Sequence, residues 1–190
     1  MGSPQAEAAR KLPSGEAPSQ PREDWEAAAR AWLGEDTGRP VHIVGVGNPI
    51  RQDDAVGLEI VSSLRRRLGA RPSPNFIIHP PSPMPERLLS RVASSGGRMM
   101  VFDAVQANRA PGAVVSARLS DTKYGYFATH NIPLRLIPGV SAGLDRSLLV
   151  GVQPGWLDVG EELSAAVKEA KGRVVAAVDA MIGGTGNGPT

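Results

Sequence analysis

The amino-acid sequence predicts an α/β protein with three layers, in which helices cover both faces of a mostly parallel, twisted sheet of about five strands. Two observations support this fold class. Strand-like and helix-like segments alternate along the chain between residues 41 and 182. The strand-like segments are also nearly continuous apolar runs, which is typical of strands that are buried on both faces.

The five predicted strands are short apolar or β-branched runs with turn residues at their ends. In chain order they cover 41–46, 75–78, 98–102, 112–119 and 147–152. Crossover connections between parallel strands are right-handed, so the carboxyl ends of the strands should meet at one edge of the sheet. Ligands bind at that edge in folds of this class.

Apolar residues at a spacing of four predict the helices that connect these strands. The clearest helix covers 54–68, where positions 56, 60, 64 and 68 are all apolar and Gly69 ends the pattern. Further helices are expected over 86–94 and about 161–182. The prolines between 80 and 85 predict a loop, because proline cannot donate a backbone hydrogen bond to a helix or a sheet.

The domain organisation follows from changes in composition along the chain. Residues 1–20 are rich in Pro, Ser, Gly, Ala and Glu and are expected to form a disordered tail. Residues 21–39 should form a helix, with two tryptophans on its apolar face, and a linker. The compact domain is expected over 40–183, followed by a flexible C-terminus over 184–190.

The composition argues against several classes of protein. The 190 residues include no cysteine, which excludes disulfides, thiolate metal ligands and a cysteine nucleophile. The formal net charge is only +2 and 4% of the residues are aromatic, so nucleic-acid binding is not expected. No apolar run reaches about 18 residues, and the N-terminus lacks the apolar segment of a secretory signal. We therefore expect no membrane span and a cytoplasmic location.

A glycine-containing turn follows the first predicted strand, in the run GVGNPI at 45–50. This run has some likeness to the dinucleotide fingerprint of a Rossmann fold. However, Ile50 takes the place of the third glycine, and His79 stands where an acidic residue would close the second strand. The sequence therefore disfavours a dinucleotide site. The glycines indicate a tight turn or a close approach of the backbone to another group.

Carboxylates begin the first main helix and end the third strand. Asp53 and Asp54 are adjacent at the start of the helix, and an N-cap explains only one of them. If Asp53 caps the helix, Asp54 is left to face the edge of the sheet at which Asp103 ends its strand. Each aspartate also has a simpler explanation, as a capping or turn-forming residue. Two carboxylates that meet at this edge would repel each other or share a cation.

Three histidines are present. His42 begins the first strand and is expected to be structural, whereas His79 ends the second strand and is a candidate for a position near the site. His130 lies in a polar loop beside Asn131, which is a candidate cap for a short helix. A single histidine in a loop is more often a surface residue than a metal ligand, so His130 gains weight only from the residues around it.

Asp54, Asp103 and His130 would together provide two carboxylates and one imidazole. Three such ligands leave coordination positions open, which suits a catalytic or transiently occupied site for Zn²⁺ or Ni²⁺. The same groups are able to activate water. A cysteine nucleophile is excluded, because the chain has no cysteine.

Four segments resemble, in order and spacing, the motifs of the [NiFe]-hydrogenase maturation endopeptidases. They are GVGNPIRQDDAVG at 45–57, VFDA at 101–104, THNIPL at 129–134 and GVQP at 151–154, the last followed by Leu163, Ser164 and Val167. The resemblance covers about residues 40–183. It implies an α/β/α fold and a peptidase that removes the C-terminal peptide of a hydrogenase large-subunit precursor once nickel has been inserted.

The resemblance also implies roles for individual residues. Asp54, Asp103 and His130 would form the catalytic and metal-contacting site. Our hypothesis for the mechanism is that Asp103 or Asp54 acts as the general base. The nickel belongs to the precursor, so the site should be empty or hold an adventitious divalent ion after purification. Five further residues are candidates for substrate binding or for support of the site: Gly47, Asn48, Asp53, His79 and Asn131.

The sequence departs from the family pattern in three places. Asp54 stands where some members have glutamate, and His79 stands where the family often has an acidic residue, so His79 either adds a ligand or replaces one. Pro138 and Gly139 shorten the helix after the histidine motif, which leaves the choice of substrate open. The main alternative function is a non-catalytic module that binds nickel or the precursor on the same fold. A more remote one is a peptidase of similar fold with other targets.

Overall fold

A five-stranded sheet forms the centre of the protein. The computed structural model describes residues 24–35, 38–69, 73–82, 86–121, 143 and 145–184. The strands are β1 (Val41–Gly45), β2 (Phe76–Ile78), β3 (Arg98–Ala104), β4 (Val114–Arg118) and β5 (Leu148–Val152). Their order in the sheet is β2-β1-β3-β5-β4. The first four are parallel to one another, whereas β4 runs antiparallel to β5 at the edge.

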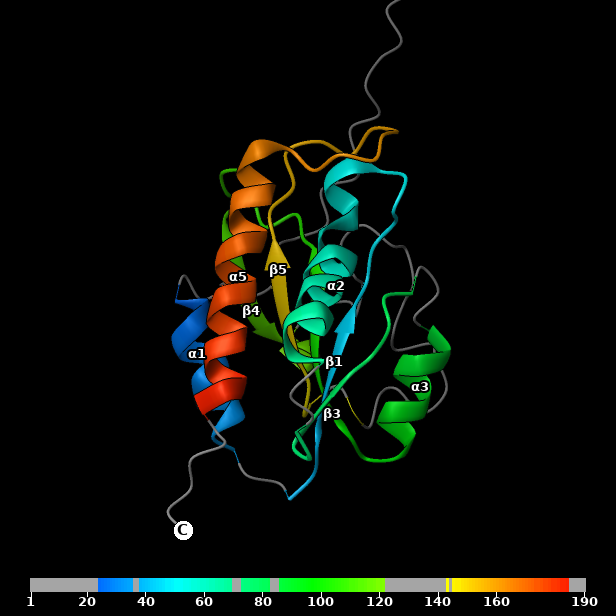
Figure 1. Ribbon diagram of the computed structural model, residues 1–190, viewed down its shortest axis with the longest axis vertical. Helices are drawn as coiled ribbons and strands as arrows, with labels where there is room; N and C mark the ends of the chain where they lie inside the picture. Colours follow the sequence, from blue (N-terminus) through cyan, green and yellow to red (C-terminus); the bar gives the residue numbers. More distant parts are fainter. Residues whose placement is uncertain are drawn as a thin grey trace, which may run out of the picture.

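Helices cover both faces of this sheet (Figure 1), which confirms the predicted three-layer α/β/α fold. The helices are α1 (Trp25–Leu33), α2 (Val56–Leu68), α3 (Glu86–Ser94) and α5 (Ala165–Gly184), and the 3₁₀ turns are η1 (Gln52–Ala55) and η2 (Leu119–Asp121). Apolar residues of α1, α2 and α5 pack on one face of the sheet. Those of α3 pack on the other face.

Strand β3 shows how the sequence builds both layers of the core. All seven of its residues are buried. Met100 and Phe102 pack with α2 and α5, whereas the intervening Met99 and Val101 pack with α3. Successive side chains of a strand point to opposite faces, so a continuous apolar run is what a strand covered on both sides requires. Each such side chain contributes about 1.5–3 kcal/mol through burial.

The N-terminal helix α1 is part of the same core. The carboxylate of Asp24 accepts a hydrogen bond from the backbone N–H of Ala27 and caps the helix, and Gly34 follows its last residue. Trp25 and Trp32 are buried on the face that packs against the sheet. The predicted helix with an apolar tryptophan face is therefore present, and it begins at Trp25.

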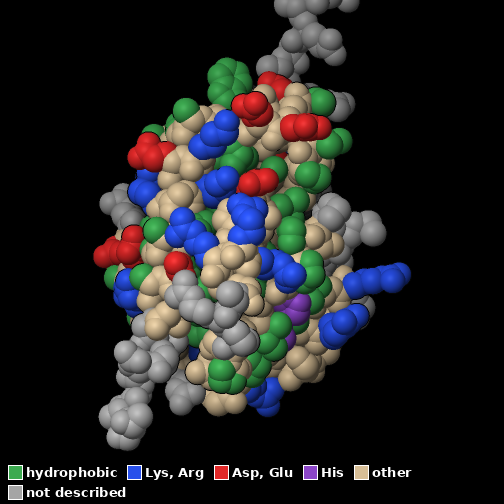
Figure 2. Space-filling view, in the orientation of Figure 1, with side chains coloured by type: hydrophobic (Ala, Val, Ile, Leu, Met, Phe, Trp, Pro, Cys, Tyr) green, Lys and Arg blue, Asp and Glu red, His purple; other side chains and the backbone are tan. Residues whose placement is uncertain are grey.

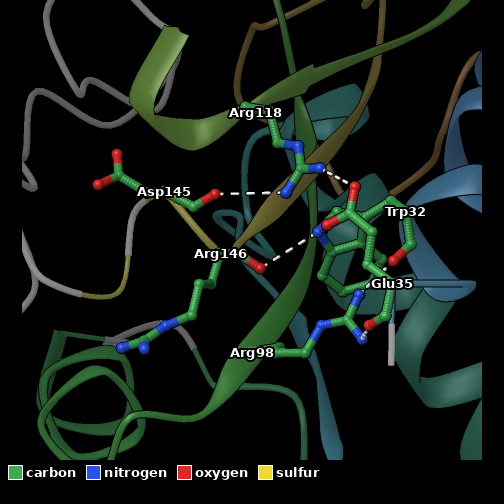
Figure 3. Close-up of polar contacts among 6 residues, drawn as sticks. All are labelled: Trp32, Glu35, Arg98, Arg118, Asp145 and Arg146. Carbon is green, nitrogen blue, oxygen red and sulfur yellow. Dashed lines mark hydrogen bonds and ion pairs between the residues drawn. The ribbon is translucent and has the colours of Figure 1, made fainter. Parts of the chain in front are cut away.

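Polar contacts around Trp32 fasten α1 to the sheet (Figure 3). The guanidinium of Arg98, the first residue of β3, lies 4.3 Å from the centre of the Trp32 ring and donates hydrogen bonds to the carbonyls of Trp32 and Glu35. Arg118 of β4 forms an ion pair with Glu35, and the indole N–H of Trp32 donates to the carbonyl of Arg146 at 3.1 Å. A cation over an aromatic ring and charge-assisted hydrogen bonds both stabilise the contact between α1 and the sheet.

The observed elements differ from the predicted ones in a few places. The helix expected over 54–68 begins with the 3₁₀ turn η1, and the helix expected from residue 161 begins only at Ala165. Because β4 is antiparallel, its carboxyl end lies at the opposite edge from those of the other four strands. The predicted tail at 1–20, the predicted short helix after Asn131 and residues 185–190 lie outside the described residues.

None of the described helices combines the length and the apolar character that a membrane-spanning helix requires.

Candidate active site

Glycines allow the start of α2 to lie directly against the ends of β1 and β3. A Cβ atom placed on Gly57 would lie 2.2 Å from the carbonyl oxygen of Phe102 and 2.3 Å from that of Val46. A Cβ atom placed on Gly45 would lie 2.3 Å from the carbonyl oxygen of Gly57. Only glycine permits backbone contacts this close. The glycines of the first motif therefore place η1 and α2 at the carboxyl end of β3.

Two aspartates are brought to this edge of the sheet. Asp54 lies in η1, three residues before Gly57, and Asp103 directly follows Phe102, whose carbonyl Gly57 contacts. Both aspartates are completely buried. One carboxylate oxygen of Asp103 accepts a hydrogen bond from the N–H of Ala104 at 2.8 Å. The expected convergence of these elements at one edge is therefore what the described backbone shows.

The loop between β1 and η1 wraps around the backbone of Asp54. The N–H of Asn48 donates to the carbonyl of Asp54 at 3.3 Å, and the Asn48 side-chain oxygen accepts from the N–H of Ile50 at 3.1 Å. A Cβ atom placed on Gly47 would lie 2.2 Å from the Asp54 carbonyl oxygen. Gly47 and Asn48 therefore support the turn in which Asp54 lies. The backbone of both residues lies against the Asp54 carbonyl, and the Asn48 side chain adds a hydrogen bond within the loop.

Asp53 does not cap α2, because no side chain does so at that helix start. Its buried carboxylate instead accepts four hydrogen bonds from the connection between β5 and α5. The donors are the N–H groups of Gly155, Trp156 and Ser164, at 2.8, 2.9 and 2.6 Å, and the Ser164 hydroxyl at 2.9 Å. Ser164 immediately precedes α5, where the helix dipole favours a negative charge. The two adjacent aspartates thus lie in different surroundings.

Gln52 completes η1 with an unusual backbone conformation. Its φ angle is +43°, in the left-handed region that residues other than glycine rarely adopt. Its N–H donates to the carbonyl of Gly160 at 2.8 Å, which fixes the conformation. Among the described residues, its buried side-chain oxygen has no hydrogen-bond partner. The sequence gives no sign of this strain, because glutamine is not a residue that marks a left-handed position.

His79 contacts His42. Nε2 of His79 lies 2.8 Å from Nδ1 of His42, and the two rings are stacked with their centres 5.1 Å apart. Burial lowers the pKa of His79 to about 4, with further contributions from the nearby His42, Arg65 and Arg91. Burial also lowers the pKa of His42. The cations that surround His79 and its bond to His42 are features that the sequence did not reveal.

His130 and Asn131 lie outside the described residues, so the predicted trio of Asp54, Asp103 and His130 stays a prediction. Within the described part of the chain, no group of three or more His, Cys, Asp or Glu side chains is placed to hold a metal ion. Of the predicted trio, the described residues therefore contain two buried aspartates, on elements that meet at the carboxyl end of β3.

The side chain of Gln153, in the fourth motif, also shapes this edge. Its side-chain oxygen accepts hydrogen bonds from the N–H groups of Ala107 at 2.8 Å and Arg109 at 3.3 Å. Both donors lie in the loop that follows Asp103. Gln153 therefore links the loop after β3 to the end of β5. The sequence motif that contains Gln153 did not predict these hydrogen bonds.

Comparison with known proteins gives a match in structure only. No protein-family model matches the sequence, and no curated protein matches it. The fold is similar to that of a [NiFe] hydrogenase maturation protease, HycI from Thermococcus kodakarensis KOD1, with a TM-score of 0.68 and 24% identity over 82% of this chain and 99% of that one.

Two Escherichia coli proteins are also similar in fold. The endopeptidase HycI has a TM-score of 0.59 and 23% identity, covering 79% of this chain and 94% of that one. The hydrogenase maturating endopeptidase HybD has a TM-score of 0.55 and 23% identity, covering 77% and 94%. These similarities agree with the sequence motifs. The chain therefore has the fold of the [NiFe] hydrogenase maturation proteases.

Proposed function

We propose that this protein is an endopeptidase that removes the C-terminal peptide from the large-subunit precursor of a [NiFe] hydrogenase. The observation that carries the proposal is the placement of Asp54 and Asp103, from the first two motifs, at one edge of a sheet with the maturation-protease fold. The order of the four motifs along the chain supports the same conclusion.

In this proposal the nickel is part of the substrate. Asp54, Asp103 and His130 would contact the nickel that the precursor carries, since carboxylate and imidazole ligands suit Ni²⁺. Asp54 and Asp103 are completely buried in this structure. A metal-bearing substrate must therefore displace the atoms that cover the carboxylates before it contacts them.

The chemical step assigned to the protein is the activation of water. One of the two carboxylates, Asp103 or Asp54, takes a proton from the water that attacks the scissile peptide bond, and so acts as a general base. The close packing of Gly57 against β3 keeps both aspartates on rigid elements. A substrate held beside them reacts as if within one molecule, which is a large source of rate enhancement.

The proposal is tested by incubating the purified protein with a precursor that either contains or lacks nickel, and by measuring the intact mass of the precursor. We expect the nickel-containing precursor to lose its C-terminal peptide and the nickel-free precursor to remain intact. Equal cleavage of both would contradict recognition through the metal. Release of a fragment from some other part of the chain would contradict the assigned cleavage.

The sequence also leaves a second function open, a module on the same fold that binds the precursor or its nickel without cutting it. The same incubation separates the two. A complex that forms with the nickel-containing precursor and never shortens it would favour the binding module and contradict the peptidase.

A further inference from the structure

Three large apolar side chains are exposed near the candidate active site. Ile50 is 58% exposed, Trp156 63% and Val159 87%. Single exposed apolar residues are common on protein surfaces and need no explanation. A group of them on adjoining loops is different, because contiguous exposed apolar surface marks sites of interaction with other proteins.

These side chains lie on two loops that are bonded to each other. Arg51 and Gly160 form a parallel β-bridge, and the N–H of Gly160 donates to the carbonyl of Ile50 at 3.0 Å. The N–H of Asp53 donates to the carbonyl of Trp156 at 3.2 Å. Ile50 is therefore next to the segment that carries Val159, and Trp156 is next to the turn that leads into Asp54.

The segment with Trp156 is held rigidly. The four hydrogen bonds to the Asp53 carboxylate fix Gly155, Trp156 and Ser164. The guanidinium of Arg51 donates two hydrogen bonds to the carbonyl of Leu157, at 3.2 and 3.0 Å. A surface that is already ordered loses little conformational freedom when it binds a partner, and this favours binding.

Acidic side chains alternate with the apolar ones on the same segment. Asp158, Glu161 and Glu162 are exposed, and no lysine or arginine occurs from 154 to 163, although the whole chain has a net charge of +2. Glu162 forms an ion pair with Lys168 on α5 at 3.1 Å. Figure 2 shows acidic and hydrophobic side chains interleaved at the upper end of the molecule, where the connection between β5 and α5 lies in Figure 1.

We propose that these residues form a docking platform for a segment of the substrate precursor that presents apolar side chains flanked by lysine or arginine. This inference rests on the proposed function. The platform consists of Ile50, Trp156, Asp158, Val159, Glu161 and Glu162. Apolar contact with Trp156 supplies affinity, because tryptophan is prominent among the residues that dominate binding energy. The acidic side chains select a basic partner and steer its approach.

The position of the platform explains why docking there would assist cleavage. Asp53 anchors the segment that carries Trp156, and Asp54 is the next residue along the chain. A precursor bound to the platform is thus held by the same turn that carries a candidate catalytic carboxylate. Asp53 connects the two sites, which accounts for two adjacent aspartates in the motif.

The experiment compares the wild type with two double variants, W156S/V159S and D158K/E161K. The control is I77S, which removes another exposed apolar side chain, on β2. Equal urea midpoints would show that all four proteins are folded. Binding of the nickel-containing precursor and its cleavage are then measured separately. We expect both double variants to weaken binding and to raise KM by about tenfold or more, with kcat within about twofold of wild type, and I77S to match wild type.

Each result bears on one proposal or the other. A KM of W156S/V159S within twofold of wild type would overturn the proposed docking platform. A rise in the KM of I77S equal to that of W156S/V159S would do the same, and neither result would contradict the proposed peptidase activity. A wild type that binds the precursor and never cuts it would overturn the peptidase, and the loss of binding in the double variants would still support the platform. A wild-type dimer in sedimentation that W156S/V159S dissociates would assign the surface to a second copy of the chain and overturn the proposal.

Discussion

Replacing Asp53 should destabilise this protein more than replacing an ordinary surface carboxylate. In Asp53→Asn, one of the two carboxylate oxygens becomes an amide NH₂ group, which accepts none of the hydrogen bonds that this oxygen now receives. Oδ2 accepts from the N–H groups of Gly155 and Trp156 and from the Ser164 hydroxyl, and Oδ1 accepts from the Ser164 N–H. A net hydrogen bond to a charged group stabilises by about 1.5–3 kcal/mol, and a buried donor left without an acceptor costs about 1–3 kcal/mol.

These contributions are not additive, because the four donors share one carboxylate. We therefore expect Asp53→Asn to lower the free energy of unfolding by about 2–4 kcal/mol, and Asp53→Ala by about 3–5 kcal/mol. For a domain of this size, a loss of about 3 kcal/mol corresponds to a fall in Tm of roughly 6–12 °C.

Urea unfolding at pH 7.5, followed by circular dichroism, measures this loss. The matched control is Asp158→Asn, which changes an exposed carboxylate on the same connection and should alter the free energy of unfolding by about 0.5 kcal/mol or less. A loss below about 1 kcal/mol in Asp53→Asn, or a loss equal to that of the control, would refute the assignment of Asp53 as the anchor of this connection.

Three further predictions concern other parts of the fold. Arg98→Met should lower the free energy of unfolding by about 2–4 kcal/mol in urea titrations, because it removes the contact with the Trp32 ring and the hydrogen bonds to the carbonyls of Trp32 and Glu35. A loss no larger than that caused by replacing an exposed arginine would contradict this role. Gln52→Gly should raise the free energy of unfolding by about 0.5–1 kcal/mol, because glycine accepts the left-handed conformation without strain; a decrease would show that the glutamine side chain stabilises the turn. The pKa of His79 is about 4 in the folded protein and near 6.5 in the unfolded chain. The free energy of unfolding is therefore highest above about pH 6.5 and decreases as the pH falls toward 4, because protonation of His79 favours the unfolded chain. We expect about 1 kcal/mol to be lost between pH 7 and pH 5, after allowance for solvent screening, and His79→Gln to reduce that loss; an unchanged pH dependence in the variant would refute the assignment.

The sequence predicted the fold well because the relevant signals are local. The apolar run of β3 and the spacing of Val56, Ile60 and Leu64 in α2 each fall within one element. The direction of β4 was not predicted, although only two of its five residues are buried, whereas β3 and β5 are buried throughout. Its pairing with β5 depends on residues that are distant along the chain.

The candidate site was predictable only in part, for the same reason. The sequence predicted that Asp54 and Asp103 would come to one edge of the sheet, since Asp54 lies at the start of a recognisable helix and Asp103 at the end of a recognisable strand. The role of Asp53 depends on Ser164, which is 111 residues away, and the contact between His79 and His42 spans 37 residues. Contacts of this kind arise from tertiary packing, and no local pattern records them.

We propose that cleavage requires the carboxylates of both Asp54 and Asp103, and intact-mass analysis of the nickel-containing precursor tests this most directly. The comparison uses wild type, Asp54→Asn, Asp103→Asn and the control Glu59→Gln, which changes an exposed carboxylate on α2 that pairs with Lys171. We expect wild type and Glu59→Gln to release the C-terminal peptide, and both aspartate variants, although folded, to release it at least about 100-fold more slowly. Cleavage at the wild-type rate by either folded aspartate variant would show that the replaced carboxylate is not required.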